Sequence, residues 1–427
     1  MSKIIWGIGT LAVLVSAGAG AKWYADQSLT SYYEQSRIAK NNYLIQYQNY
    51  KMGAVSGSAD VKFTLQRDPC VEQSKMIFVG QDNIKRTWQG YKISSTLELQ
   101  NKNDKYANLF KQPIHAETII QWTGQVKTKI DLPKIDMDIG QMKLQLDPAL
   151  IKVHSQVKDK TTVIKDMEFT LANARLMDQK GHMQVRDVSF KTNQGMNPVG
   201  LESGYTEWKT DQIQMSLNKP DASSVMLKGL EVKMDTVLHD KTADIKTLLK
   251  IGQVMTAQNS QYQKAEFHFD FKELNRTQLD QYFKLFSQKD TSCAASKSFD
   301  ADALKSLVSV FNSGFMIESK DNHMQTTSGD LKANLQAKIM PNYVNSAEML
   351  KQMLPSLIDA EMDINFDQKM LVELLKLKPS QNGQVSTQQQ VEMTLKALEE
   401  KGQIKREGSS IKMGMQYKFG QPIFKTL

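Results

Sequence analysis

The feature that most constrains the fold of this chain is an alternation of apolar and polar residues with a period of two. In its clearest stretch the apolar positions are Ile135, Met137, Ile139, Met142 and Leu144. The phase shifts after Gly140, which predicts a β-bulge at that glycine. A period of two gives an extended strand one apolar face and one polar face, so the pattern predicts amphipathic β-strands.

Similar stretches recur from about residue 49 to residue 240, separated by clusters of Gly, Pro, Asn and Asp. Their apolar positions include Val61, Phe63, Leu65, Met167, Phe169, Leu171, Met183 and Val185. No long helical pattern interrupts this region of the sequence. We therefore predict that it forms mainly antiparallel sheet.

From about residue 241 the pattern changes to strands that alternate with helices. The predicted helices are one capped by Asn275 and reaching Leu285, one capped by Asp300 and ending near Phe311, and helices over 345–358, 368–377 and 386–401. Ser346 is the expected N-cap of the third helix and Gly402 the expected end of the last. Residues 22–48 also carry a helical pattern.

The first residues form an uncharged run from Ile4 to Ala21 behind Lys3. A helix over this run covers about 27 Å, which spans a thin bilayer core. The residues of such an anchor are Ile4, Ile5, Trp6, Leu11, Val13, Leu14 and Val15, with Trp23 and Tyr24 at the interface. A cleaved signal peptide is the alternative, because small residues recur between Ala17 and Ala21. A buried core helix is a third interpretation.

Both export interpretations place the body of the chain in the periplasm, either tethered to the inner membrane by a single pass or released after cleavage. The predicted fold is a β-rich α+β class: an N-terminal membrane helix, long antiparallel sheets, and helices concentrated in the C-terminal half. The predicted domains are an anchor or uncleaved signal over 1–25, a β-rich domain over 26–240, and an α+β domain of strand–helix units over 241–427.

The net charge of +8 and the pI of about 9.0 favour contact with anionic surfaces. The stretch from Ala397 to Gly408 resembles the end of a winged-helix recognition helix and its wing. The predicted export and the long strand that follows both argue against this interpretation. We therefore expect membrane contact and no nucleic-acid partner.

Chemistry-bearing motifs are missing from the sequence. The six histidines lie far apart, which excludes an HExxH zinc site, and the chain has no CxxC pair, GxSxG elbow, Walker loop or GxGxxG. Ser155 and Lys158 match SxxK by spacing alone, and Asp136 and Asp138 fit the solvated face of a strand. We expect no enzyme activity, no metal and no cofactor.

The two cysteines, Cys70 and Cys293, lie far apart in the sequence. In an exported chain such a pair could form one disulfide that cross-links the two halves of the body. Two unpaired buried thiols are the alternative. The spacing alone does not decide between them, because a disulfide requires close Cα atoms.

Segments at both ends of the chain resemble the bacterial YdgA-like family, a family of unknown function anchored in the inner membrane. They are the residues Gly20 to Tyr24, Tyr50 to Gly57, Leu398 to Gly408 and Gly420 to Ile423. Where the family usually carries His-Gly-Pro, this chain has Gln112, Pro113, Ile114 and His115. The resemblance implies an envelope protein and no catalytic residues.

The function remains open between three hypotheses. The first is a membrane-anchored envelope scaffold or assembly partner. The second is binding of lipid or another apolar ligand in a β groove, with Ile135, Met137, Ile139, Met142 and Leu144 as candidate lining residues. The apolar alternations Phe267-Phe269-Phe271 and Met413-Met415-Tyr417 motivate it, because each such face must be buried against something. The third is an unrecognised envelope enzyme. The oligomeric state does not follow from the sequence.

Overall fold

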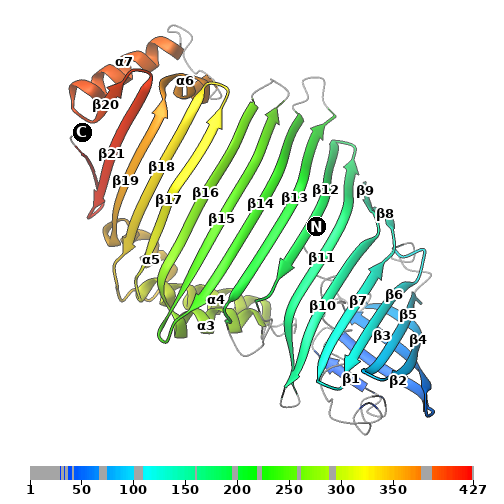
Figure 1. Cartoon of the computed structure of the whole chain (residues 1–427). Helices are drawn as coiled ribbons and strands as arrows, with labels where there is room; N and C mark the ends of the chain where they lie inside the picture. The colour runs from blue at the N-terminus through cyan, green and yellow to red at the C-terminus, as the bar shows by residue number, and fades with distance from the viewer. Residues whose placement is uncertain are drawn as a thin grey trace. The chain divides into compact units, whose positions relative to one another are not determined.

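The structure is a computed structural model that describes residues 29, 33, 37–40, 43–66, 75–100, 109–158, 161–194, 201–218, 224–256, 261–287, 295–376 and 387–425. The chain divides into two compact units. The first unit comprises Met1–Pro220 and Lys284–Asp300, and the second comprises Asp221–Phe283 and Ala301–Leu427. Both are built on long antiparallel strands (Figure 1).

The strands of the first unit are β1 (Arg37–Lys40), β2 (Tyr43–Met52), β3 (Ser56–Gln66), β4 (Lys75–Thr87), β5 (Gly90–Leu99), β6 (Ile114–Gln121), β7 (Gln125–Leu132), β8 (Ile135–Ile139), β9 (Met142–Leu146), β10 (Ala149–Lys158), β11 (Thr161–Asp178), β12 (Gly181–Thr192) and β13 (Gly204–Leu217). Consecutive strands pair from β1 to β7, β10 pairs with β7, and β11, β12 and β13 follow in order. All these pairings are antiparallel, as the sequence predicts.

The bulge predicted at Gly140 is wrong, because Gly140 lies in a hairpin turn. Strands β8 and β9 pair with each other, and Ile139 lies opposite Met142. Gly140 has a φ of +62°, which a glycine adopts without the steric cost of a Cβ and which suits a two-residue hairpin turn. The phase shift in the sequence therefore marks a change of strand. Strand β9 then pairs with the second half of β11.

The helical pattern predicted over residues 22–48 is wrong where the structure describes strands β1 and β2. Ile45 and Tyr47 alternate on one side of β2 and are buried in the core of the first unit. Cross-strand pairing of β2 with β3 buries these side chains, and this tertiary contact overrides the local preference.

The strands of the second unit are β14 (Ser224–Leu238), β15 (Thr242–Thr256), β16 (Gln261–Asn275), β17 (Phe315–Thr326), β18 (Gly329–Ile339), β19 (Ile358–Asp367), β20 (Ile404–Glu407), β21 (Ser410–Lys418) and β22 (Gln421–Phe424). They pair antiparallel in chain order from β14 to β19. Strand β21 then pairs with β19 on one edge, and with β20 and β22 on the other.

The described helices are α3 (Arg276–Ser287), α4 (Ala295–Asn312), α5 (Ala347–Leu357), α6 (Gln368–Lys376) and α7 (Thr387–Glu400). Asn275 and Ser346 accept hydrogen bonds from the first turns of α3 and α5, as predicted. Asp300 is not a cap, because it lies inside α4. No proline or glycine separates it from Ala295, so the helix extends upstream through residues that tolerate it.

The β-rich fold with long antiparallel sheet and few helices agrees with the sequence prediction. The helices are not concentrated at the C-terminus. They are spread among the strands between Arg276 and Glu400, and the last described elements of the chain are the strands β20, β21 and β22. Among the described residues, none of these helices is both long and apolar enough to cross a membrane.

Candidate functional site

The second unit carries a sheet surface whose side chains are apolar and remain partly exposed. The register places alternate residues of neighbouring strands side by side: Val232 opposite Leu249, Leu249 opposite Phe267, Leu335 opposite Met362, and Met362 opposite Met415. We define the apolar face as Val232, Met234, Leu249, Phe267, Phe269, Leu335, Met362, Ile364, Met413 and Met415. None of these side chains is buried, and Phe269 is 37% exposed.

At one end of the apolar face, helices cover the sheet only over the last residues of β19. There α6 and α7 pack in a cluster of Val391, Leu395, Ile404 and Ile411, against which Phe366 and Met413 also lie. Phe366 and Ile411 are cross-strand partners on β19 and β21. These residues share the side of the sheet that carries Met362 and Met415, because residues two apart in a strand point the same way.

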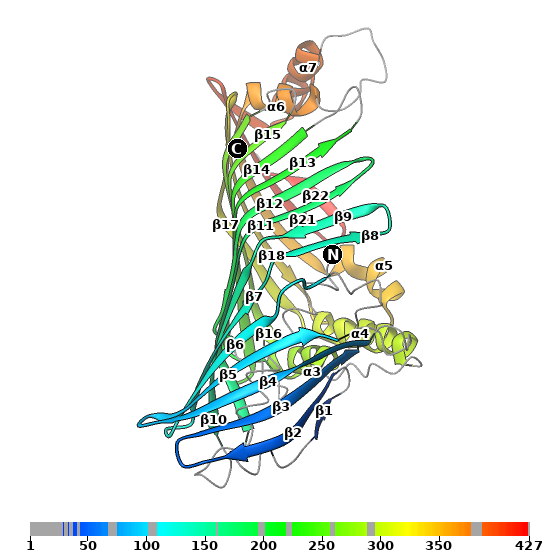
Figure 2. The same cartoon turned by 90° about the vertical axis from the view of Figure 1, so that its right-hand side faces the viewer.

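A second group of helices covers the opposite end of the same side. Phe311 of α4 contacts Phe315 of β17 edge-on, with ring centroids 5.3 Å apart, and Phe315 lies 6.4 Å from Phe271. Phe315 and its strand partner Ile339 are both buried. Figure 2 shows α6 and α7 at one end of these strands and α4 and α5 at the other. Apart from Met413, which packs at the edge of the α6–α7 cluster, the apolar face lies between the two helical groups.

A bulge in β17 interrupts the apolar face with two buried polar residues, Ser319 and Asn322. The Asn322 amide donates to Ser319 Oγ and to the Ala333 carbonyl, both at 2.9 Å, and its oxygen accepts from His268 N at 2.7 Å. Ser319 Oγ donates in turn to the His268 carbonyl at 2.5 Å. These polar groups are therefore satisfied inside the sheet and are not arranged to bind a polar ligand.

The other side of the same strands is charged. Lys272 and Lys320 both form ion pairs with Glu318, and Lys250 pairs with Glu266 at 3.3 Å. Hydrogen bonds from Lys272 and then from Lys320 hold the pKa of Glu318 below its ordinary value. Cross-strand ion pairs of this kind are typical of a solvated sheet surface. The sheet of the second unit thus has one charged and one apolar side.

The family model of a bacterial protein of unknown function, DUF945, matches residues 1–424. The chain belongs to this family. This agrees with the resemblance to the YdgA-like family that the sequence carries. No curated protein and no solved structure matches the chain.

The groove predicted from Ile135, Met137, Ile139, Met142 and Leu144 is not where the structure has an open apolar surface. Ile135, Met137 and Leu144 are buried in the core cluster of the first unit. Met142 is 39% exposed beside the hairpin turn. For Ile139 the structure describes the backbone alone. The alternating pattern correctly predicts strands here, but it does not distinguish a face that is buried in the core from one that stays open.

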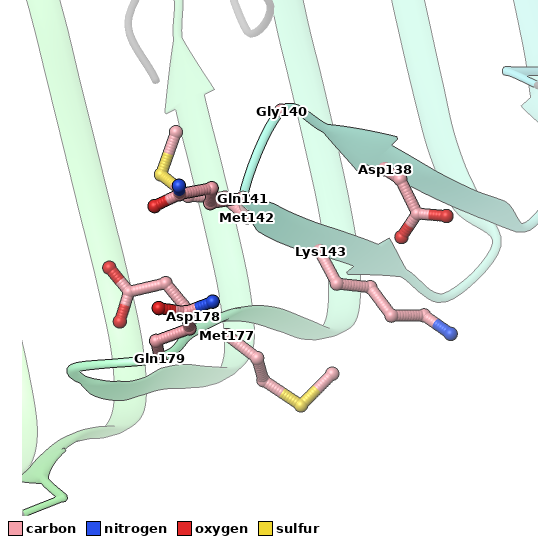
Figure 3. A pocket seen from close by; sticks show the side chains of 8 residues that line it. All are labelled: Asp138, Gly140, Gln141, Met142, Lys143, Met177, Asp178 and Gln179. Atoms are coloured by element: carbon pink, nitrogen blue, oxygen red, sulfur yellow. The ribbon is translucent and has the colours of Figure 1, made fainter.

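An open hollow of about 290 Å³ lies at the β8–β9 turn (Figure 3). Its lining residues are Asp138, Gly140, Gln141, Met142, Lys143, Met177, Asp178 and Gln179. Asp178 accepts backbone hydrogen bonds from Lys180 and Gly181 and so fixes the β11–β12 turn. In Figure 3 the side chains point in different directions and do not converge on one position. The hollow has the features of a strand-end surface and not of a catalytic site.

The predicted membrane anchor, from Ile4 to Tyr24, and the cysteines Cys70 and Cys293 lie outside the described residues. Among the residues that are described, no group of His, Cys, Asp or Glu could hold a metal ion. His154, His239 and His268 each contact a single carboxylate on a strand surface or turn. Ser155, the start of the SxxK spacing, is buried in β10.

Proposed function

We propose that this protein is a membrane-anchored, non-catalytic protein of the periplasm that holds lipid acyl chains on the apolar face of its second unit. The observation that carries the proposal is the exposure of that face between two helical groups. Soluble proteins rarely leave a contiguous apolar surface of this extent open, and such surfaces mark binding sites. The site residues differ from those expected from the sequence, but the ligand class is the same.

The size of the apolar face suits an acyl chain. Across the strands, from β14 to β21, the face measures about 29 Å, at about 4.8 Å between neighbouring strands. Along the strands it measures about 13 Å, which is the length of the segment from Ala360 to Ile364. One leaflet of a bilayer core is about 15 Å thick, which is half of the whole core. An extended acyl chain therefore fits within the face.

The chemistry of the face supports lipid over a polar ligand. Its side chains carry no charge, and the two polar residues that the β17 bulge places beside them, Ser319 and Asn322, already bond each other and the backbone. Met234, Met362, Met413 and Met415 contribute thioether side chains, which adapt to irregular apolar partners because they are unbranched and polarisable. A ligand without hydrogen-bonding groups loses nothing by binding here.

The test is the amount of lipid that the full chain retains after extensive washing in detergent, measured by mass spectrometry. Phe269→Glu and Met362→Glu place a charge on the apolar face and should lower the retained lipid severalfold. Gln336→Glu, on the charged side of β18, is the matched control and should leave it unchanged. Lipid bound around the predicted anchor is common to all three variants. Equal lipid in all of them, with the fold intact, would rule the proposal out.

A scaffold that docks another envelope protein is the second candidate. Phe419 and Ile423, in and after the β21–β22 turn, are 86% and 50% exposed and favour a protein contact at that edge. Pull-down of the same partner by the wild type and by Met362→Glu, but not by Phe419→Ala, would support this candidate. A partner lost equally in Met362→Glu would instead place the protein contact on the apolar face.

A further inference from the structure

Three turns of the first unit meet at one end of its sheet. They connect β2 to β3, β4 to β5 and β6 to β7. Arg86 N donates to the Val55 carbonyl at 2.8 Å, and Trp122 N donates to the Gln89 carbonyl at 3.0 Å. The indole Nε1 of Trp122 donates to the Trp88 carbonyl, also at 3.0 Å. We define this end, formed by Val55, Trp88 and Trp122, as the tip.

The tip presents large apolar side chains to solvent. Trp88 is 86% exposed, Val55 63% and Trp122 43%. The ring of Trp122 is held edge-on against Tyr91, with centroids 5.2 Å apart, and the Arg86 guanidinium lies 5.7 Å from its centroid. These contacts hold the Trp122 ring in place within the tip. Trp88, in the neighbouring β4–β5 turn, is the most exposed of its three side chains.

The tip is also basic. Lys51, Lys85, Arg86 and Lys127 are exposed on the strands next to these turns. The segments 51–56, 85–92 and 119–127 contain no aspartate or glutamate. Lys92, deeper in β5, forms an ion pair with Glu117 at 2.6 Å. An exposed tryptophan surrounded by basic residues matches the interface of an anionic bilayer, where indole rings lie at headgroup level.

The start of the described chain is held against the same end of the first unit. Leu29 and Tyr33 are buried in its core, and the ring of Tyr33 stacks on Tyr50 with centroids 4.9 Å apart. Tyr50 lies on β2 just before the turn that bears Val55. If the predicted anchor ends near residue 25, the chain from there to Leu29 reaches at most about 14 Å. The tip-bearing end must then lie close to the bilayer surface.

We propose that the tip docks on the surface of an anionic bilayer, with Trp88 in the headgroup region and Lys85, Arg86 and Lys127 facing lipid phosphates. This contact orients the first unit on the membrane and is separate from lipid binding on the apolar face of the second unit. It draws on the predicted anchor for its location. Loss of acyl-chain binding in Phe269→Glu would leave it unaffected.

The test uses the full chain in vesicles of phosphatidylcholine and phosphatidylglycerol that contain phospholipid with brominated acyl chains, which quench nearby tryptophan. The five tryptophans of the chain are compared by difference. The emission removed by Trp88→Phe should be strongly quenched in the wild type. Trp208 on β13 is half-buried, so the part of the wild-type emission that Trp208→Phe removes should not be quenched.

The basic residues are tested by Lys85→Gln, Arg86→Gln and Lys127→Gln combined in one variant, with Lys401→Gln as the control for an exposed lysine of the second unit. The combined variant should lose most of the Trp88 quenching, and Lys401→Gln should retain it. Trp88 emission that is unquenched by brominated lipid and freely quenched by iodide would overturn the proposal.

Discussion

The two units use the same amphipathic antiparallel strands and treat the apolar side of those strands differently. In the first unit, apolar side chains from β2 to β11 pack into one cluster, and Phe78, Ile130 and Val153 are 1% exposed or less. In the second, the apolar face stays open between helices, and Phe269 is 37% exposed. Period-two alternation guarantees an apolar side but does not determine what covers it. We therefore expect the apolar side of the first unit to stabilise its fold, and the apolar side of the second unit to bind a ligand.

The largest expected effect is the difference in unfolding free energy between the alanine variants of two phenylalanines, Phe78 and Phe269. Phe78 contacts Phe63 and Phe110, with ring centroids 5.9 Å and 5.8 Å away, so Phe78→Ala leaves a cavity and should cost about 3–5 kcal/mol. Phe269→Ala should cost less than about 1 kcal/mol, because partly exposed side chains lose little on truncation. Hydrogen exchange of the β4 and β16 amides measures both. Equal losses would mean that the apolar face is covered in solution.

The next effect concerns the bulge of β17. Asn322→Ala leaves the His268 amide without its acceptor and removes the hydrogen bond that Ser319 Oγ accepts, which should cost about 1–3 kcal/mol in the second unit. Asn334 is the matched control, since its side chain accepts one exposed hydrogen bond, from Asp321 N at 2.8 Å. Asn334→Ala should therefore cost less than Asn322→Ala by the same measurement. The reverse order would show that the bulge does not depend on the buried pair.

A smaller effect is a pH dependence of the first unit. Burial raises the pKa of Asp82 above its ordinary value of 3.8, and hydrogen bonds from Ser95 and Tyr33 offset part of the rise. The Tyr33 bond is 2.8 Å long. Because the pKa of Asp82 is higher in the folded than in the unfolded chain, the folded state favours the protonated carboxyl. This contribution to stability is complete below 3.8 and is lost as the pH rises through the folded value.

Asp82→Asn removes the titrating group and keeps an acceptor for Tyr33. The decline in stability of the first unit above pH 3.8 should therefore flatten in this variant. Asp138→Asn, at an exposed position, should keep the wild-type profile. Thermal unfolding across the pH range makes the comparison, and an unchanged slope in Asp82→Asn would assign the dependence to other groups.

The smallest effect is expected on the charged side of the second unit. Glu318→Gln removes two ion pairs, yet these pairs border solvent and should contribute no more than about 1 kcal/mol. Because hydrogen bonds from Lys272 and Lys320 lower the pKa of Glu318, its contribution should persist above the ordinary glutamate range. It should be lost as the pH falls through the lowered value. A larger loss at neutral pH would point to a structural role beyond a solvated surface.

Local signals in the sequence were enough to predict the strands and several helix boundaries. Asn275 and Ser346 are caps because their side chains bond the backbone within three residues. The alternation at Phe267, Phe269 and Phe271 predicted one apolar side that needs a partner. The structure places Phe267 and Phe269 on the open face. These features depend on residues close in the sequence, so the pattern alone contains them.

The features that the sequence did not predict join distant residues. Burial of Ile135 and Met137 depends on which strands pack over the β8–β9 hairpin. In the tip Trp88 lies beside Trp122, which is 34 residues away in the sequence. The successive pairings of β4 with β5, β5 with β6 and β6 with β7 bring the two residues together. A tryptophan two residues before Gly90, in a turn between strands, was a signal that could have marked it. Long-range pairing determines whether a surface is open, and single-sequence patterns do not contain that information.

A photo-crosslinking scan along β18, in cells whose lipids carry labelled phosphate, tests directly whether lipid lies on the apolar face. Ala333 and Leu335 lie on the apolar side, and Lys332, Asn334 and Gln336 on the charged side. A photoreactive residue at each position should give lipid adducts at 333 and 335 and none at 332, 334 and 336. Adducts without this period of two, or protein adducts alone at 333 and 335, would contradict an apolar face that holds lipid.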